Sequence, residues 1–209
     1  PALRGGGFTR RVEVSSNQGT PIMTTRRTSL SDPLYINWIA GIVSGRVGIT
    51  IAPGKQSTSL YMPNSIWRRD LATDLDTLVS LGATDLVTLL EDRDITRLAI
   101  PGLFDQARAS GLCTHHLPIV DGSVPEHEAP LHALLTMLRQ RLDEGASVVI
   151  HCEGGKGRSG VVAGCLLLSL GASLPQALQH LRQARGPNCP ENPRQLVYLE
   201  RFANQLRSW

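Results

Sequence analysis

One segment of this sequence limits the possible folds more than any other. The short apolar run at 147–150, "SVVI", leads directly into the glycine-rich stretch 151–160, "HCEGGKGRSG", and an apolar helical run follows over 158–170. A strand, a glycine-rich turn and a helix in this order are typical of α/β proteins. In parallel sheets such a turn lies beyond the carboxyl end of its strand, where ligands bind. The segment therefore predicts a fold class and also the place of a site.

The rest of the chain alternates strand-like and helix-like segments. Strands are predicted at 33–39, 47–52, 84–90 and 112–120, and helices at 63–82, 95–111, 126–145, 174–186 and 192–209. In the helix over 63–82, Asn64 is the N-cap candidate and Gly82 the stop, whereas the helix over 95–111 is expected to break near Pro101. We therefore expect an α/β fold in which a central, mostly parallel mixed sheet is flanked by helices on both faces.

Residues 1–30 differ from the remainder of the sequence. They are rich in Gly, Ser, Thr and Arg and show no sustained hydrophobic period, which favours a flexible N-terminal arm. Residues 31–209 are then expected to form a single domain. We expect a cytoplasmic monomer without a membrane span, because the longest apolar stretch is short and interrupted and the N-terminus lacks the apolar core of a secretion signal.

Charge and cysteine content exclude several classes of protein. The formal net charge is only +3, and the arginines are scattered rather than clustered with aromatic residues, which argues against a nucleic-acid surface. His115 and His116 are adjacent on a strand and face opposite ways, so we expect structural roles for them and no metal or organic cofactor. The four cysteines lack a CxxC pair, and reduced thiols are expected. These are Cys113, Cys152, Cys165 and Cys189.

The loop after "SVVI" has the composition of an oxyanion site. Its backbone N–H groups can curl into a nest at a helix N-terminus, and Arg158 can close the nest with two parallel N–H donors. The residues that supply these N–H groups are Glu153, Gly154, Gly155, Lys156 and Gly157. A free thiol ionises near pH ~8.5, and a helix N-terminus with cationic neighbours favours its ionised form. We therefore expect Cys152 to be a thiolate that attacks phosphorus.

Two neighbours of Cys152 are expected to assist it, and two other kinds of loop compete with this interpretation. Ser159 is placed to donate a hydrogen bond to the sulfur, and His151 to order the loop by bonding its backbone. A nucleotide-binding loop is excluded because Lys156 is followed by Gly157 and not by a hydroxyl residue. A structural loop with an inert buried cysteine is the remaining alternative.

The motif His151-Cys152-x5-Arg158-Ser159 resembles the signature loop of the cysteine-dependent protein phosphatases, the tyrosine and dual-specificity group. The segments "PLYINWI", "GLCTHHLPIVDGSVPE", "VIHCEGGKGRSGVVAGCLLLSL" and "RQLVYLERF" look like those of its cyclin-dependent-kinase-associated branch, in the same order. The resemblance extends over about residues 31–207. It implies hydrolysis of phosphotyrosine, phosphoserine or phosphothreonine in a protein substrate through a phosphocysteine intermediate.

The resemblance also implies roles for residues outside the loop. Asp121 precedes the segment "GSVPE", which resembles a hinge, and matches the general acid of the family. The fallback candidates for this role are Glu126 and Glu128, and the competing interpretation is that their carboxylates only stabilise a helix N-terminus. Gln195 matches the glutamine near the hydrolytic water, and a surface position on the last helix is the competing interpretation. Two interpretations remain for the charged residues after the strand at 84–90: they line the rim of the site, or they form a solvated charge run. These residues are Asp92, Arg93 and Arg97.

Some alternatives remain open from the sequence. Lys156 resembles a basic loop residue of phosphoinositide phosphatases, whereas the carboxylate of Glu153 is expected to repel a polyanionic headgroup. A phosphoprotein-binding pseudophosphatase and a sulfur transferase are further alternatives. Oxidised Cys152 is expected to have Cys113 or Cys189 as its candidate disulfide partner, and the sequence does not rank the two.

Overall fold

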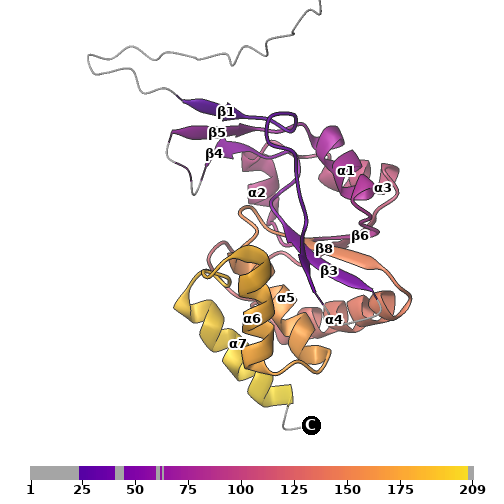
Figure 1. Ribbon diagram of the computed structural model, residues 1–209, viewed down its shortest axis with the longest axis vertical. Helices are drawn as coiled ribbons and strands as arrows, with labels where there is room; N and C mark the ends of the chain where they lie inside the picture. The colour runs from indigo at the N-terminus through magenta and orange to yellow at the C-terminus, as the bar shows by residue number, and fades with distance from the viewer. Residues whose placement is uncertain (1–23, 41–44, 60–61, 63, 207–209) are drawn as a thin grey trace, which may run out of the picture.

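The computed structural model describes residues 24–40, 45–59, 62 and 64–206 (Figure 1). Its main sheet has five strands in the order β2-β3-β8-β6-β7. The bounds are β2 (Asn37–Ile39), β3 (Arg46–Thr50), β6 (Asp85–Thr88), β7 (Cys113–His116) and β8 (Ser147–His151). Only the pair β2 and β3 runs antiparallel; the other three pairs are parallel. The predicted mostly parallel mixed sheet is therefore confirmed.

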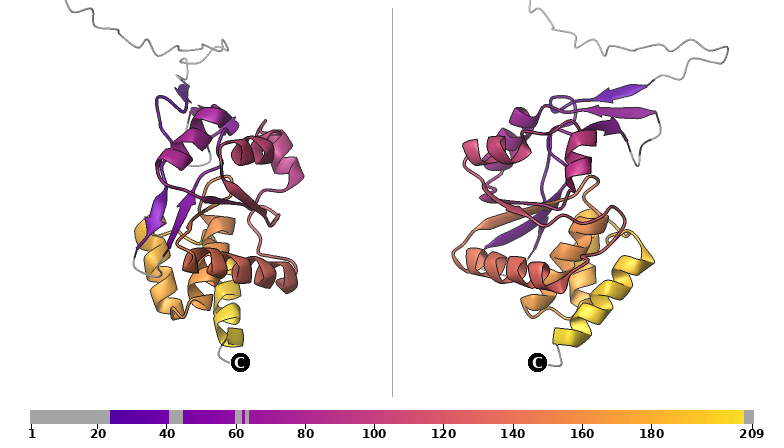
Figure 2. Two further views of the ribbon diagram at one scale, coloured as in Figure 1. Left: turned by 90° about the vertical axis from the view of Figure 1, so that its right-hand side faces the viewer. Right: turned by 180° about the vertical axis from the view of Figure 1, so that it is seen from behind.

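Helices cover both faces of this sheet, as Figure 2 shows. The helices of one face are α1 (Leu71–Ser80), α2 (Asp92–Arg97) and α3 (Leu103–Ala109), and those of the other are α4 (Glu128–Asp143), α5 (Gly157–Ser169), α6 (Leu174–Arg185) and α7 (Pro193–Leu206). Successive residues of β8 alternate between the two cores: Val149 packs with the first group, Val148 and Ile150 with the second. Both cores share one sheet, and the fold is a single domain.

A second, small sheet contradicts the prediction of a helix over the whole of 63–82. Its order is β1-β5-β4, with β1 (Thr25–Arg27), β4 (Gln56–Thr58) and β5 (Ser65–Arg68). The strand β5 buries Ser65 and Trp67 alternately with more exposed neighbours, which is the period of a strand. The helix α1 begins only at Leu71, where Asp70, and not Asn64, is the N-cap: its carboxylate accepts a hydrogen bond from the Thr73 backbone N–H.

The residues predicted as an arm are in part outside the described residues. Of the range 1–30, residues 1–23 are not described, and the remainder contains β1, which pairs in parallel with β5. Ser29 anchors this part: its hydroxyl accepts from the Asp70 backbone N–H at 2.8 Å and donates to the Asp70 carbonyl at 3.2 Å. Residues 25–29 are thus joined to the start of α1.

Two loops at the carboxyl ends of the parallel strands form the site. The first follows β8, which lies between β3 and β6 with all five residues buried, and it leads into α5. The second follows β7, which is shorter than the predicted strand 112–120 and ends at His116. Residues 117–127 then run as a loop up to α4. Among the described residues no helix is long and apolar enough to cross a membrane.

Candidate active site

The backbone of the glycine-rich loop is held from its outer side. Arg185, at the end of α6, donates from Nε to the Gly155 carbonyl at 2.6 Å and from Nη2 to the Gly154 carbonyl at 2.7 Å. The Glu153 carbonyl accepts from the Ala52 N–H at 3.1 Å and from Lys55 Nζ at 3.3 Å. With these carbonyls turned outward, the inner side of the turn is left to backbone N–H groups, as an anion-binding nest requires.

Gly155 is required for this turn. Its φ of +64 lies in the left-handed region, which glycine adopts without strain. A Cβ atom at this position would lie 2.4 Å from the Thr50 carbonyl oxygen of β3, which is too close for any other residue. The packing of the loop against β3 therefore depends on a glycine at 155.

Arg158 lies in the first turn of α5 and is almost completely buried. Its Nη1 donates to Asp94 Oδ2 at 2.6 Å and to the Ile119 carbonyl at 3.1 Å. Its Nη2 lies 2.8 Å from Asp121 Oδ1, close enough for an ion pair but without hydrogen-bond geometry. Nε and Nη2 are both buried and have no hydrogen-bond acceptor among the described residues. One edge of the guanidinium is therefore fixed, and two donors remain for a ligand.

Asp94 connects Arg158 to the back of the loop. Its carboxylate also accepts from Arg97 Nη2 at 2.8 Å, and the same Nη2 lies 2.6 Å from Glu153 Oε2. Burial acts to raise the pKa of Asp94, but the hydrogen bonds and charges of Arg97 and Arg158 outweigh it and lower the pKa. The carboxylate of Glu153 is thus buried beside Arg97. The expected repulsion of an anionic headgroup by Glu153 is weakened by this pairing.

Cys152 lies at the base of the loop and is 3% exposed. Its sulfur lies 3.5 Å from the Ser159 hydroxyl, within reach of the hydrogen bond expected between them. Burial acts to lower the pKa of Arg158, but the charges of a Cys152 thiolate and of Asp94 and Asp121 outweigh it and raise the pKa. The charged form of the guanidinium is thus stabilised by the groups around it.

His151 is fully buried at the end of β8. Its Nε2 lies 2.8 Å from the Thr88 hydroxyl on β6, and its Nδ1 lies 3.4 Å from the Cys152 carbonyl. Burial is the main cause that lowers its pKa to about 4. The imidazole is therefore neutral near neutral pH, and it ties the start of the loop to β6.

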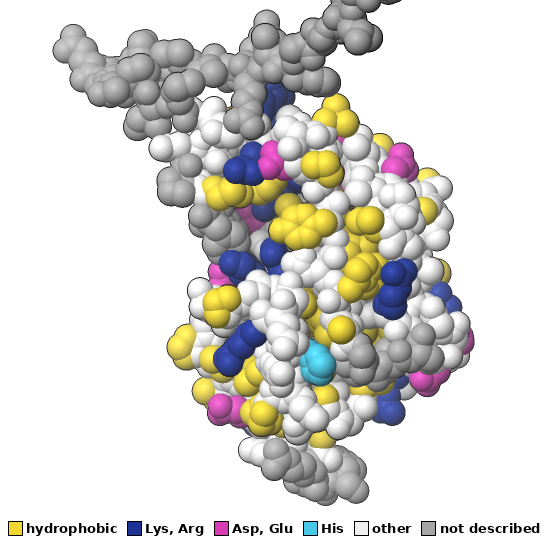
Figure 3. Space-filling model, in the orientation of Figure 1, with side chains coloured by type: hydrophobic (Ala, Val, Ile, Leu, Met, Phe, Trp, Pro, Cys, Tyr) yellow, Lys and Arg dark blue, Asp and Glu magenta, His cyan; other side chains and the backbone are white. Residues whose placement is uncertain are grey.

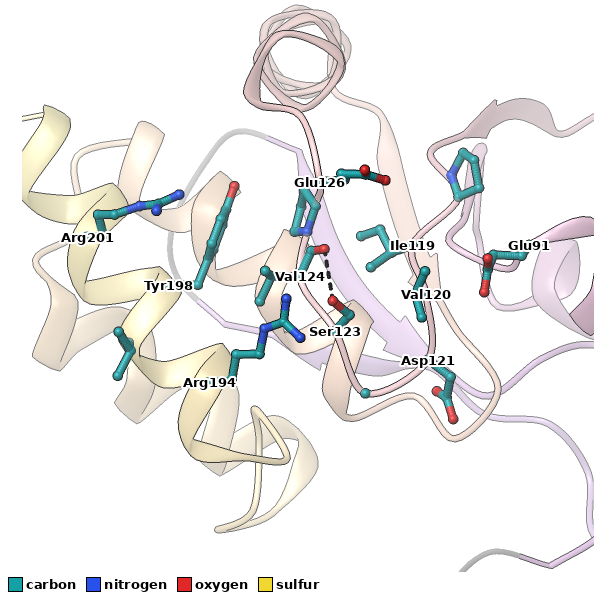
Figure 4. Close-up of a pocket in the computed structure, with 14 residues that line it drawn as sticks. Glu91, Ile119, Val120, Asp121, Ser123, Val124, Glu126, Arg194, Tyr198 and Arg201 are labelled. Carbon is teal, nitrogen blue, oxygen red and sulfur yellow. Dashed lines mark hydrogen bonds between the residues drawn. The ribbon is translucent and has the colours of Figure 1, made fainter.

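Asp121 lies on the loop between β7 and α4, and 64% of its side chain is exposed (Figure 4). Figure 4 shows its carboxylate at the turn of this loop, pointing away from the arginines of α7. The pair with Arg158 brings it to the mouth of the glycine-rich loop. Glu126 is exposed further along the same loop, whereas Glu128 begins α4 and contacts Arg201 at 3.2 Å. Of the three predicted acids, only Asp121 forms an ion pair with Arg158.

Gln195 is fully buried, so the interpretation as a surface helix residue is wrong. Its amide nitrogen donates to the Ser123 carbonyl at 3.0 Å, and its amide oxygen accepts from the Glu191 backbone N–H at 3.0 Å. A Cβ on Gly157 would lie 3.0 Å from the same amide nitrogen. The side chain therefore lies between the Asp121 loop and the glycine-rich loop.

The remaining candidates lie in different places. His115 contacts Asp85 at 2.8 Å, and His116 contacts the Leu90 carbonyl at 2.8 Å, so the two imidazoles have separate partners. Among the described residues no group of three or more His, Cys, Asp or Glu side chains could hold a metal ion. Arg93 forms a pair with Glu91 and is largely exposed, whereas Arg97 belongs to the site through Asp94.

The structure separates the two candidate partners of an oxidised Cys152. Cys113 begins β7 and therefore lies at the amino edge of the sheet, opposite the glycine-rich loop. Cys189 is buried against α5, with its sulfur 3.4 Å from the Lys156 carbonyl. Burial raises the pKa of Cys189 to about 12 and that of Cys165, in the core, still further. Only Cys189 adjoins the loop, and its pairing with Cys152 stays a prediction.

Sequence reasoning missed four residues that shape the site: Lys55, Asp94, Arg185 and Asn192. Each acts over a long sequence separation; Asn192, for example, donates to the Gly122 carbonyl at 3.0 Å. The one signal in the sequence is the charge run at 92–97, in which Asp94 lies between Arg93 and Arg97. No local pattern pointed to Lys55, Arg185 or Asn192.

Comparison with known proteins identifies the family of the chain. Residues 29–178 match the family model of cyclin-dependent kinase inhibitor 3 (CDKN3). The human cyclin-dependent kinase inhibitor 3 is 31% identical over 179 residues, which cover 83% of this chain and 81% of the relative. The chain belongs to this family. Through it, the chain is a member of the cysteine-dependent tyrosine and dual-specificity phosphatase superfamily, as the resemblance of the loop implied.

Further relatives agree with this assignment. The pig cyclin-dependent kinase inhibitor 3 is 35% identical over 83% of this chain and 81% of the relative, and the mouse protein tyrosine phosphatase type IVA 3 is 29% identical over 66% and 74%. Among solved structures, a kinase associated phosphatase whose catalytic-site cysteine is replaced by serine is similar with a TM-score of 0.72. It is 29% identical, and the match covers 85% of this chain and 98% of that structure.

Proposed function

We propose that this chain is a protein phosphatase that hydrolyses phosphotyrosine, phosphoserine or phosphothreonine through a phosphocysteine intermediate. The observation that carries the proposal is the pair of buried Arg158 donors, Nε and Nη2, that make no hydrogen bond to the described residues, with Nη2 in an ion pair with Asp121 at 2.8 Å. Unsatisfied buried donors are costly, and two parallel donors match two oxygens of a phosphoryl group. Cys152, Ser159 and Asp121 lie around this guanidinium.

In the first step, the sulfur of Cys152 attacks phosphorus. The S–P bond forms as the P–O bond to the leaving group breaks, and Asp121 transfers a proton to that oxygen. The equatorial oxygens accept hydrogen bonds from the loop N–H groups and from Arg158, which stabilise the charge of the transition state. The products of this step are the free alcohol or phenol, the phosphocysteine and the Asp121 carboxylate.

In the second step, water attacks the phosphocysteine. The Asp121 carboxylate accepts a proton from the water as the new P–O bond forms and the S–P bond breaks. Ser159 stabilises the departing thiolate, which it faces at 3.5 Å. Gln195 would orient the water from its position between the two loops, after its amide turns from the Ser123 carbonyl. Inorganic phosphate leaves, and the enzyme returns to its initial state.

A direct test is phosphate release from an aryl phosphate in the presence of a chelator, combined with rapid acid quench of a radiolabelled phosphopeptide. We expect metal-independent turnover, and protein-bound label that resides on Cys152 in a thiophosphate linkage. Binding of vanadate without any release of phosphate would instead assign the loop to phosphoprotein recognition. Release of thiocyanate from thiosulfate and cyanide, without phosphate turnover, would assign it to sulfur transfer.

Replacing Asp121 by asparagine should lower kcat/KM about 10²-fold for a phosphoserine peptide, because its alkoxide leaving group needs a proton. The loss should be much smaller for an aryl phosphate with an acidic phenol, which leaves without protonation. Turnover of the two substrates measures this difference. Glu126→Gln, on the same loop, is the matched control and should change neither rate by more than about two-fold. Equal losses on both substrates would argue against Asp121 as the general acid.

The family suggests which proteins to test first. The similarity to a kinase associated phosphatase supports a phosphorylated protein kinase as a substrate of this chain. Phosphopeptides from kinase activation segments, carrying phosphotyrosine or phosphothreonine, are therefore the first panel. Preference for one of the two residues would assign the chain to tyrosine or to serine and threonine specificity.

A further inference from the structure

A cavity of about 350 Å³ adjoins the glycine-rich loop on the side of the small sheet. Gly154 and Lys156 of the loop form one wall, and Trp67 of β5 and Tyr35 line other parts. Figure 3 shows dark-blue Lys and Arg side chains and yellow hydrophobic side chains around a recess on this face of the molecule. The cavity lies at the carboxyl end of β3, beside the loop that carries Cys152.

The charge of the cavity is strongly positive. Among the described residues that line it, five are cationic and one is acidic: Arg27, Lys55, Arg69, Lys156 and Arg185, with Asp32. Two of the cations have carboxylate partners, since Arg69 binds Asp74 at 2.7 Å and Arg27 pairs with Asp32. Arg185 donates to neutral acceptors, namely the carbonyls of the loop and the amide oxygen of Asn37. The cavity therefore favours an anion.

Lys55 is unusual among the residues that line the cavity, because only 2% of this charged residue is exposed. Its ammonium group donates to the Glu153 carbonyl at 3.3 Å and lies 5.0 Å from the centre of the Trp67 ring. Burial is the main cause that lowers its pKa to about 8. A buried ammonium without a hydrogen-bonded carboxylate is costly, and an anionic ligand would offset that cost.

A second unsatisfied group also lines the cavity. Arg27 Nε is buried and has no hydrogen-bond acceptor among the described residues. The guanidinium carbon of Arg27 lies 5.7 Å from the centre of the Trp67 ring, on the same aromatic residue that Lys55 approaches. Arg69 also lies 5.5 Å from this ring, so three of the lining cations gather at Trp67, and of these Arg27 keeps a donor without an acceptor among the described residues.

The geometry points to a binding site in this cavity for a second phosphoryl group, carried by a residue near the one that is hydrolysed in the same peptide substrate. The inference rests on the proposed function and adds a substrate class to it: doubly phosphorylated segments. A peptide is favoured over a lipid headgroup because the walls are partly aromatic and apolar, with Trp67, Tyr35 and Leu34 available to a side chain and its backbone.

The test compares singly and doubly phosphorylated peptides. A second phosphoserine is placed at each of the four positions on either side of the hydrolysed residue, and binding to the full-length Cys152→Ser variant is measured by calorimetry. We expect a Kd about ten-fold lower for at least one doubly phosphorylated peptide, as charge-assisted hydrogen bonds predict. Equal affinity for all peptides would overturn the second site.

Two opposite variants of one ion pair provide matched controls. The preference is the ratio of the Kd of the singly phosphorylated peptide to that of the doubly phosphorylated one. Arg27→Gln removes a cation from the cavity and should reduce this preference to about two-fold, whereas Asp32→Asn removes the lining carboxylate and should increase it. Both break the same Arg27–Asp32 pair, so a loss of stability cannot explain opposite effects. A preference that neither variant changes would place the second phosphate elsewhere and overturn the site. The same response for an inositol bisphosphate, but for no peptide, would overturn the peptide assignment.

The pH dependence provides a separate test of Lys55. The charged groups around its ammonium are Glu153, Cys152, Arg69 and Arg185, and serine at 152 removes the titration of the thiol. A phosphoserine is a dianion throughout pH 7 to 9, since its second pKa is about 6. The preference for doubly phosphorylated peptides should therefore decline as the pH rises to about 8, because Lys55 loses its proton there and the Cys152→Ser variant lacks the thiolate charge that raises this pKa. A preference constant from pH 7 to 9 would exclude Lys55 from the site.

Activity on an aryl phosphate, measured in parallel on the native chain, separates the two proposals. Arg27→Gln and Asp32→Asn, made singly in the chain that retains Cys152, should leave this turnover within about two-fold, because the two residues pair with each other and not with the catalytic loop. Turnover of the aryl phosphate without tighter binding of any doubly phosphorylated peptide would overturn the second phosphate site alone. A preference without turnover would overturn the hydrolase reaction and leave a doubly phosphorylated ligand for the site.

Discussion

Replacing Cys152 by serine should lower kcat/KM for an aryl phosphate by at least about 10⁴-fold, the scale on which loss of a catalytic nucleophile acts. The serine hydroxyl is not ionised near neutral pH, so it cannot replace a thiolate as nucleophile. Binding of vanadate should persist, because Arg158 and the loop N–H groups are unchanged. Phosphate release and vanadate affinity, measured on the same preparation, separate the chemical step from binding.

The matched control is Cys113→Ser. Cys113 is exposed and begins β7, at the edge of the sheet opposite the glycine-rich loop. Its replacement should leave kcat/KM within about two-fold, as for other exposed positions. Turnover by Cys152→Ser above one hundredth of the native rate would mean that another group attacks phosphorus.

The parts of the fold that the sequence predicted best are those specified by local pattern. The strand at 147–151, the glycine turn and α5 are consecutive, so the relative positions of Cys152, Arg158 and Ser159 follow from one stretch of backbone. Val149 faces one core and its neighbours Val148 and Ile150 the other, which is why the sequence of this strand is a continuous apolar run.

The errors arose where pairing with distant residues decided the structure. The segment 65–68 has helical spacing when it is read together with 71–80, but it pairs with β1 and β4, and only Asp70 begins the helix. Asn64 adopts a positive φ of 54, which asparagine tolerates in turns, instead of serving as an N-cap.

The prediction of the site was also limited by contacts between residues that are distant in the sequence. Asp94 lies 64 positions before Arg158 in the sequence, and Arg185 lies 30 positions after Gly155, yet each donates or accepts a hydrogen bond that fixes the loop. Gln195 was equally compatible with a surface and with a catalytic role, because amphipathic spacing alone does not place it against the loop of Asp121. Its burial becomes evident only when α7 packs on α5.

Replacing Arg158 by lysine should lower kcat/KM for an aryl phosphate by about 10³-fold, the upper range for loss of an oxyanion donor. A lysine ammonium can keep the contact with Asp94, but it cannot at the same time direct two parallel donors at the phosphoryl oxygens. Vanadate affinity should fall together with the rate, since the same donors bind both. Initial rates and vanadate inhibition measure the two effects.

Arg97→Lys is the control that separates this effect from a disturbance of the hydrogen bonds around Asp94. Arg97 contacts the same carboxylate, Asp94, but from outside the loop, with 49% of its side chain exposed. Its replacement by lysine keeps the charge next to Asp94 and Glu153 and removes no donor from the phosphate, so we expect less than about a ten-fold loss. Thermal unfolding of both variants tests whether they remain folded. If the two substitutions reduced the rate equally, catalysis would depend on the hydrogen bonds of the shared network, and the two unsatisfied donors of Arg158 would not be the phosphate site.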